Sequence, residues 1–241
     1  MLGPVLADGK WIPDKDQRAI LAVLALQAGE IVPYDVLIEA LGGDLSKPSL
    51  QGRVRRLQAR LAHCDIRIAG HRGTGCRLEL APDEVDALLL ERLCAEGVLL
   101  AESGQWAEAL GVFNQALNLY RSDPFSDTPS SLLELKWLQH LQDTWLRALR
   151  FRIRADIHLG RYEAAISTLK RLTTERSTEE IYWALLMLAE YRAGSRPAAK
   201  KTYQSARSAL FQELDVDPGD LLEGIRLQIR NKVPPLDIPV P

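Results

Sequence analysis

Positive charge gathers in one short segment of this 241-residue chain, although the formal net charge of the whole chain is only −2. From Lys47 to Leu78 the sequence KPSLQGRVRRLQARLAHCDIRIAGHRGTGCRL holds eight lysine or arginine residues and a single acidic residue, Asp65. The guanidinium group of arginine can grip a phosphate or the O6 and N7 atoms of guanine, and glutamine can pair with adenine. Such a local excess of basic side chains indicates a contact with nucleic acid.

The basic side chains belong to one face of a predicted helix that runs from about Pro48 to Leu61. At about 100° per residue, the apolar residues of this helix form a buried stripe, which consists of Leu50, Val54, Leu57 and Leu61. The opposite face is centred on Gly52 and Ala59, with Arg55 and Arg56 on either side. Further round, one edge carries Arg53 and Arg60, and the other carries Gln51 and Gln58.

Small residues between long arginine side chains let a helix backbone lie close to a surface. A glycine inside a helix costs roughly 1 kcal/mol relative to alanine, so Gly52 suggests close approach rather than helix strength. Because an α-helix fits the major groove of B-DNA, we expect Arg55 or Arg56 to touch base edges and Ser49, at the helix start, to meet a phosphate. The alternative interpretation of the charge alone is a solvated basic helix face, and Arg18 is a basic residue outside the cluster.

The elements around this helix predict a winged helix-turn-helix. The opening LGPVLADGKWIPDKD alternates like a short hairpin, and QRAILAVLALQAGE and PYDVLIEALGG have apolar residues at helical spacing and end near glycine. After the third helix, IRIAG and CRLEL alternate as two strands joined by the glycine-rich turn HRGTG.

The second half of the chain carries a repeat. The spacing of Gly104, Trp106, Ala109, Phe113 and Ala116 recurs from Gly160 and again from Gly194, and the last two copies lie 34 residues apart. This period is similar to that of tetratricopeptide helical hairpins. The interval between the first and second copies is 22 residues longer than this period, and the additional residues include the predicted loop RSDPFSDTPSS.

These motifs together resemble a known family. SLQGRVRRLQARL followed by IRIAGHRGTGCRLEL resembles the recognition helix and wing of OmpR-type domains. LGP, QRAILAVLALQAGEIV and LIEALGG resemble the N-terminal domain of the Streptomyces antibiotic regulatory protein family, and ELDVDPGDLLEGI resembles a motif of its activation domain. The chain departs from the family at Cys76, where tyrosine is usual, at Gly42, where tryptophan is common, and at Pro33, where serine usually caps the helix; Met1 falls where relatives often have more strand residues.

The resemblance implies a mainly α fold with a small β component. It divides the chain into a winged-helix DNA-binding domain (1–81), a tetratricopeptide-like bacterial transcriptional activation domain (82–231) and a proline-rich tail (232–241). It implies a transcription activator of a secondary-metabolite gene cluster that binds direct repeats in double-stranded DNA and recruits RNA polymerase with its principal sigma factor. The resemblance does not decide whether the protein binds DNA as a dimer. The expected DNA-binding residues are Ser49, Gln51, Arg53, Arg55, Arg56, Gln58 and, in the wing near the minor groove, Arg72.

Several classes of protein fit the sequence poorly. There is no P-loop lysine, GxSxG or HExxH motif, so we expect neither an enzyme nor a cofactor. Cys64, Cys76 and Cys94 match no common metal-ligand spacing, and no apolar run is long enough to cross a bilayer, so we expect a cytoplasmic protein without a metal site. The alternative function is a protein-interaction scaffold whose winged helix no longer reads DNA.

Overall fold

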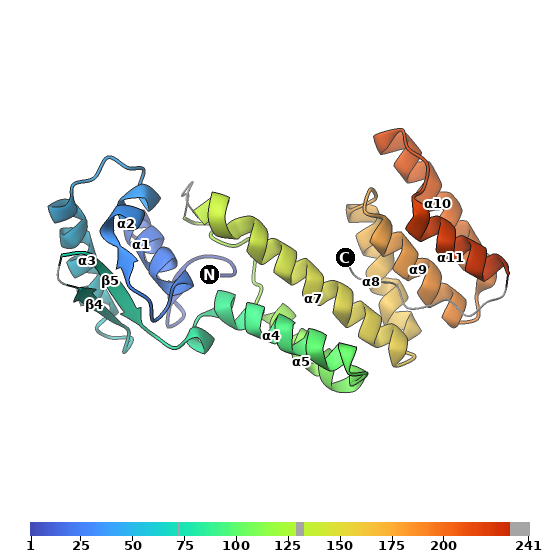
Figure 1. Cartoon of the computed structure of the whole chain (residues 1–241), viewed down its shortest axis with the longest axis horizontal. Coiled ribbons are helices and arrows are strands. Elements are labelled where there is room, and N and C mark those ends of the chain that lie inside the picture. The colour runs from blue at the N-terminus through green and yellow to red at the C-terminus, as the bar shows by residue number, and fades with distance from the viewer. Residues whose placement is uncertain (72, 129–132, 232–241) are drawn as a thin grey trace. The chain divides into compact units, whose positions relative to one another are not determined.

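The structure is a computed structural model, and it describes residues 1–71, 73–128 and 133–231. The described part is mainly helical with two small antiparallel sheets, as predicted (Figure 1). It separates into two compact units, of which the first contains residues 1–99 and 111–149. The second contains residues 100–110 and the chain from Arg150 onward.

The chain begins with the predicted hairpin and first helix. Strands β1 (Leu6–Ala7) and β2 (Lys10–Trp11) pair antiparallel, with Leu6 opposite Trp11. Helix α1 (Lys15–Leu26) starts at the N-cap Asp14, whose carboxylate accepts the backbone N–H groups of Asp16 and Gln17 at 2.9 and 3.1 Å. These bonds satisfy donors that a helix start otherwise leaves free. Every residue of α1 from Gln17 to Leu26 is buried, so this helix is the centre of the first domain's core.

Helices α2 (Tyr34–Ala40) and α3 (Lys47–Leu61) both pack on α1 and on each other. The N-cap of α2 is Pro33, whose apolar ring accepts no hydrogen bond from the backbone N–H groups of the helix. The turn after α2 uses Gly42 and Gly43 at φ of 97° and 87°, in the left-handed region that favours glycine. Helix α3 starts one residue before the predicted Pro48, and the backbone N–H of Ser49 donates to its N-cap Ser46.

The wing is a three-stranded sheet in the order β3-β5-β4. The predicted strands β4 (Arg67–His71) and β5 (Gly75–Glu79) pair antiparallel, and β5 also pairs with β3 (Val32–Pro33), which the sequence pattern did not indicate. A β-carbon at Gly75 would lie 2.2 Å from the carbonyl oxygen of Val32. Only glycine therefore lets β5 approach β3 closely enough to complete the sheet.

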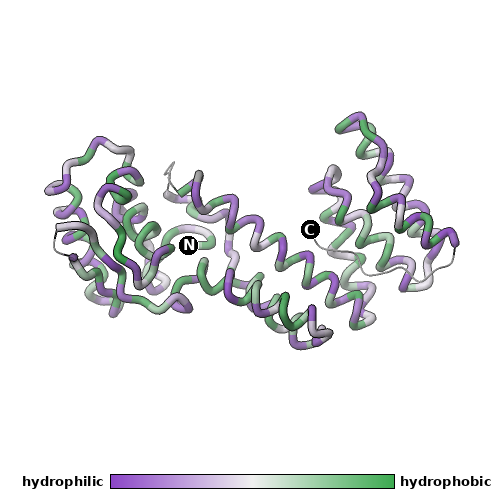
Figure 2. Tube along the Cα trace, viewed as in Figure 1, coloured by the Kyte–Doolittle hydropathy of each residue, from purple (hydrophilic) through white to green (hydrophobic). Residues whose placement is uncertain are grey.

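The rest of the described chain consists of helices and the segments that connect them. A 3₁₀ turn (Pro82–Glu84) leads to α4 (Asp86–Glu102) and α5 (Trp106–Asn118), and a π-helical turn (Glu134–Leu138) leads to α7 (Gln139–His158). Four further helices follow: α8 (Tyr162–Glu175), α9 (Glu180–Arg192), α10 (Arg196–Leu214) and α11 (Asp220–Arg230). Hydrophilic and hydrophobic residues alternate along α7, as in an amphipathic helix (Figure 2). The predicted loop RSDPFSDTPSS lies in part outside the described residues.

The predicted repeat corresponds to three helical hairpins. Gly104, Gly160 and Gly194 end α4, α7 and α9 with φ of 78°, 74° and 85°, so each glycine makes a turn between two helices. The small and apolar repeat residues after each turn are buried, and they include Ala109, Phe113, Ala116, Ala165, Leu169, Ala199 and Ala206. Helix α9 packs against α8, α10 and α11, which explains why it is apolar nearly all round. Among the described helices, none is long and apolar enough to span a bilayer.

Candidate nucleic-acid interface

Helix α3 presents two faces of opposite character. Leu50, Leu57 and Leu61 are buried against the rest of the domain, and the fourth residue of the predicted stripe, Val54, is half-buried. On the other side Arg55 and Arg56 are exposed. The amphipathic winding predicted for this helix is confirmed, because burying the leucines turns these two arginines outward.

The arginines of α3 differ in what holds them. Arg53 forms an ion pair with Asp16 of α1, so its guanidinium group already has a carboxylate partner. Within the described part of the chain, Arg55, Arg56 and Arg60 have no acidic partner. These three guanidinium groups are therefore free to bind an external anion or a base edge.

The surface between the free arginines is open. A β-carbon added at Gly52 would meet no atom within 4 Å, and the neighbouring Ala59 is exposed. Packing within the protein therefore does not explain the glycine. A flat strip between Arg55 and Arg56 would let the helix backbone come close to a ligand surface, as the sequence suggested.

The glutamines lie at the edge of α3 that faces the wing. The side-chain oxygen of Gln58 accepts the backbone N–H of Ile68 in β4 at 2.6 Å, and Gln51 is half-buried. The bond from Gln58 ties the helix to the wing. It also uses one of the two lone pairs of the Gln58 side-chain oxygen, so a contact with adenine would have to share that oxygen with the wing.

The start of α3 offers groups for a phosphate. Ser49 is exposed in the first turn, and its hydroxyl oxygen accepts a hydrogen bond of 3.0 Å from Ser46. Lys47 is also exposed, and its ammonium group lies 3.4 Å from the carboxylate of Asp35, an exposed pair that contributes little to stability. A helix start carries partial positive charge, so anions are favoured there.

The wing turn is only partly described, because Arg72 lies outside the described residues. Beside it, Thr74 donates from its hydroxyl to the carbonyl of His71 at 3.0 Å, which tightens the turn. Arg67, at the start of β4, is exposed and has no acidic partner in the described ranges. The sequence pattern did not single out Arg67; its place in the basic segment, within the alternating strand IRIAG, was the available signal.

Cys76 does not disturb the sheet. Its side chain is 1% exposed, and it pairs with Val32 on one side and Gly70 on the other. Burial raises the pKa of its thiol to about 11, so the group stays neutral at physiological pH and packs as a small apolar side chain. The wing therefore forms with cysteine where the sequence resemblance led us to expect tyrosine.

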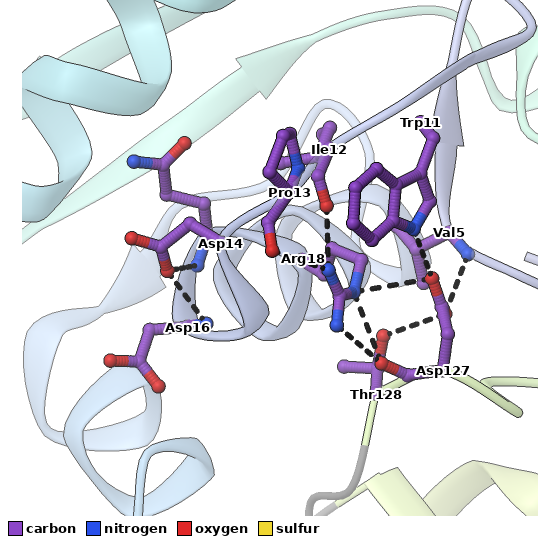
Figure 3. A network of polar contacts seen from close by, with 10 residues as sticks. Val5, Trp11, Ile12, Pro13, Asp14, Asp16, Arg18, Asp127 and Thr128 are labelled. Atoms are coloured by element: carbon purple, nitrogen blue, oxygen red, sulfur yellow. Dashed lines mark hydrogen bonds and ion pairs between the residues drawn. The ribbon is translucent and has the colours of Figure 1, made fainter.

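Arg18, the basic residue outside the cluster, is a buried structural residue. It is 7% exposed, and it donates to the carbonyl oxygens of Ile12 and Pro13 at 2.6 and 3.0 Å and to that of Asp127 at 2.7 and 3.1 Å. Its guanidinium group also lies 5.3 Å from the centre of the Trp11 ring (Figure 3). A buried cation needs such partners, and α1 supplied no hint of them.

The carboxylate of Asp127 completes this network from the segment between α5 and α7. It accepts the backbone N–H of Val5 at 2.9 Å and the indole N–H of Trp11 at 3.2 Å, as the dashed lines in Figure 3 mark. A second link joins Asp86, at the start of α4, to the backbone N–H of Leu2 at 3.2 Å and to Arg121 at 3.1 Å. The winged helix thus shares one compact unit with the first helices that follow it.

Comparisons with known proteins agree with this architecture. Residues 85–230 match the family described as bacterial transcriptional activator domain. The chain is 29% identical to the regulatory protein DnrI of Streptomyces peucetius over 253 residues, which cover 98% of this chain and 93% of DnrI. It is 29% identical to the transcriptional regulator RedD of Streptomyces coelicolor over 252 residues, which cover 99% of this chain and 72% of RedD.

A solved structure has the same fold over nearly the whole chain. The structure of Mycobacterium tuberculosis EmbR in complex with a low-affinity phosphopeptide superposes with a TM-score of 0.88 at 27% identity and covers 98% of this chain. This chain spans 65% of that EmbR chain. A winged helix joined to a bacterial transcriptional activator domain, together with the match to regulators along almost its full length, means that the chain belongs to the Streptomyces antibiotic regulatory protein family of transcription regulators.

Proposed function

We propose that this chain is a sequence-specific DNA-binding transcription activator that reads DNA with α3 and grips it with the wing. The observation that carries the proposal is the outer face of α3, where Arg55 and Arg56 are exposed and flank the open strip at Gly52. A helix with this surface fits the major groove, and free arginines there can bind guanine bidentately. Neither an enzymatic reaction nor a cofactor is part of this function.

The other expected residues take supporting roles in the proposal. Ser49 and the start of α3 bind a phosphate, and Arg72 reaches the minor groove or its phosphates. Arg53 and Gln58 orient α3 through Asp16 and Ile68 and reach DNA at its edges. The DNA-binding domain is residues 1–81, and residues 82–231 form the activation domain.

The wider role follows the family. The target is a set of direct repeats near the promoter of a secondary-metabolite gene cluster, and the partner of the helical domain is RNA polymerase with its principal sigma factor. The protein acts in the cytoplasm, where its DNA and the polymerase are. A scaffold with a degenerate winged helix is the competing function, and the buried Cys76 and the complete three-stranded wing give it no support.

The proposal is tested by measuring the DNA affinity of three variants, Arg55→Ala, Arg56→Ala and Arg72→Ala, and of one control. A preferred site is first selected from random duplex DNA, and Kd is then measured by fluorescence anisotropy for that site and a scrambled one at two salt concentrations. Arg55→Ala or Arg56→Ala should weaken binding to the selected site by about 1 to 3 kcal/mol and relax preference at one base position. Lys10→Ala is the control, because Lys10 is exposed on β2 and has no acidic partner in the described ranges.

Loss of a phosphate contact has a different signature. It weakens both DNAs alike and lowers the slope of log K against log salt by about one unit, as we expect for Arg72→Ala. If Arg55→Ala and Arg56→Ala bind both DNAs like the parent, α3 carries only a solvated basic face and the scaffold function replaces the activator. In a purified transcription assay, the parent should stimulate a promoter that carries the selected site.

A further inference from the structure

A groove lies on the surface formed by α9, α10 and α11, in the second compact unit and on elements other than the DNA-reading helix. Its volume is about 590 Å³, and its lining includes the apolar side chains of Met187, Ala199 and Ile229. Met187 and Ala199 are almost fully buried, so they form the floor and not the rim. The apolar floor means that an occupant must bring apolar groups of its own.

The rim of this groove is strongly basic. It carries five cationic side chains, from Arg196, Lys200, Arg207, Arg226 and Arg230. Two acidic side chains lie near them: Glu223 binds Arg226 at 2.5 Å, and Asp217 lies 3.3 Å from Arg207. Positive charge therefore remains in excess around the groove.

Two of these cations are unused within the described part of the chain. The side chains of Lys200 and Arg230 have no acidic partner there, and Arg196 donates only to the backbone carbonyl of Arg230, at 2.7 Å. Their presence around an apolar floor favours an occupant that carries carboxylates beside apolar side chains.

The same face of α10 continues past the groove as an apolar surface. Residues 196, 200, 203, 207, 211 and 214 follow a spacing of three or four and therefore share one side of the helix. At the far end of this side, Phe211 and Leu214 are 60% and 53% exposed. These two side chains form a small exposed apolar patch, which a partner that lies along this face can cover.

The length and chemistry of this face select the kind of partner. Helix α10 has 19 residues, so the continuous face is about 28 Å long, which a small anion cannot cover. The phosphates of duplex DNA would use the cations, but they would leave the apolar floor and Phe211 uncovered. An amphipathic helix of about five turns covers both, with its apolar stripe on the floor and its carboxylates on the rim.

We propose that the groove and the outer face of α10 dock an acidic amphipathic helix of a partner protein. This deepens the proposed role of the helical domain as the part that binds partners. Because it concerns elements apart from α3, its main test uses peptides, and DNA enters only as a final comparison. Its failure would leave the DNA affinities of the Arg55 and Arg56 variants unchanged, and failure of DNA reading would leave peptide binding intact.

The test uses two synthetic, fluorescein-labelled helical peptides of about 19 residues. The first has leucine at every third or fourth position and glutamate on both flanks of that stripe; the second has lysine in place of each glutamate. Fluorescence anisotropy with the full chain should show saturable binding of the acidic peptide, weaker at high salt, and little binding of the basic one. No saturable binding of the acidic peptide would overturn the proposal.

Charge reversal then locates the site. The double variant Lys200→Glu, Arg230→Glu should bind the acidic peptide roughly tenfold more weakly and the basic peptide more tightly than the parent, a reversal that a merely misfolded groove would not produce. Lys201→Glu is the matched control, because Lys201 is exposed on α10 but about 100° round the helix from Lys200. Equal loss of acidic-peptide affinity in the control would mean general charge attraction and would overturn the site.

Two further readouts complete the test. Phe211→Ser should weaken acidic-peptide binding without changing its salt dependence, because Phe211 contributes apolar contact and no charge. Random-sequence duplex DNA provides the last arm. If the double charge-reversal variant loses affinity for that DNA while it binds the acidic peptide like the parent, the groove contacts nucleic acid and the proposal is wrong.

Discussion

Replacing Gly52 by alanine separates the needs of the fold from those of DNA binding. Gly52 lies inside α3, its φ is not in the left-handed region, and an added β-carbon would meet no atom within 4 Å. The protein therefore tolerates the methyl group, and alanine gains about 0.8 to 1.0 kcal/mol of helix propensity over glycine. We expect Gly52→Ala to raise the free energy of unfolding by about 1 kcal/mol, which raises Tm by roughly 2–4 °C in a chain of this size.

The same methyl group should weaken DNA binding. If the backbone at Gly52 lies against the floor of the major groove, a β-carbon there overpacks the contact. Overpacking costs about 1 kcal/mol or more, so Kd for the selected site should rise roughly fivefold or more. Thermal unfolding followed by circular dichroism and anisotropy titrations measure the two effects on the same preparation.

Gly111→Ala in α5 is the matched control. Gly111 also lies inside a helix, where it is exposed while Gly52 is half-buried, and a β-carbon at either glycine would meet nothing within 4 Å. It should stabilise the protein by a similar amount and leave DNA affinity unchanged. A Gly52→Ala protein that is more stable but binds DNA like the parent would refute close approach at this residue; one that is less stable would refute our account of its surroundings.

Three further predictions concern buried polar groups. Arg18→Ala should lower the free energy of unfolding, measured by thermal denaturation, by about 3 kcal/mol, because it removes a buried cation that makes several hydrogen bonds. The surface variant Lys10→Ala should change the free energy of unfolding little. Equal stability of the two variants would contradict the network in Figure 3. In native protein, DTNB should modify the partly exposed Cys64 within minutes and the buried Cys76 only after unfolding, because burial raises the pKa of the Cys76 thiol to about 11; fast reaction of Cys76 would mean that the wing opens. Burial also raises the pKa of Asp156 above its ordinary value of 3.8, so the folded state binds the carboxyl proton more tightly than the unfolded state does. Protonation of Asp156 therefore stabilises the folded state. This contribution is fullest below pH 3.8 and is lost as the pH rises through the raised pKa. The free energy of unfolding of the parent should therefore rise relative to that of Asp156→Asn as the pH is lowered from 7 toward 4, and a gap that stays constant would show that Asp156 does not titrate in this way.

Much of helix α3 could be predicted from local pattern. The spacing of Leu50, Leu57 and Leu61 requires one side of α3 to be buried, which turns Arg55 and Arg56 outward. Periodicity is a property of neighbouring residues, so it survives without knowledge of the rest of the fold. The repeat that includes Gly104, Gly160 and Gly194 was visible because its spacing recurs along the chain, and the structure places each glycine at a helix end in the left-handed conformation.

Pairings between distant segments were not visible in this way. Strand β3 has only two residues, Val32 and Pro33, and it is a strand because β5 lies beside it. Gly75 looked like one more glycine of the wing turn, and only the carbonyl of Val32, 2.2 Å from where its β-carbon would be, shows why no other residue fits. Two-residue strands carry too little pattern to be predicted, because their stability comes from the partner strand.

The sequence by itself determined the helices, the wing hairpin and the outward face of α3, because helical and strand periods follow from the order of apolar and polar residues. Only the tertiary structure decided which charged residues are free. Arg18, Arg53 and Arg55 are the same residue type, but their environments differ. Arg18 is buried against Asp127, Arg53 is paired with Asp16, and Arg55 is exposed without an acidic partner in the described ranges. The role of an arginine depends on carboxylates and carbonyls that the fold brings to it from as far as 109 residues away, and the pattern of neighbouring residues does not predict these contacts.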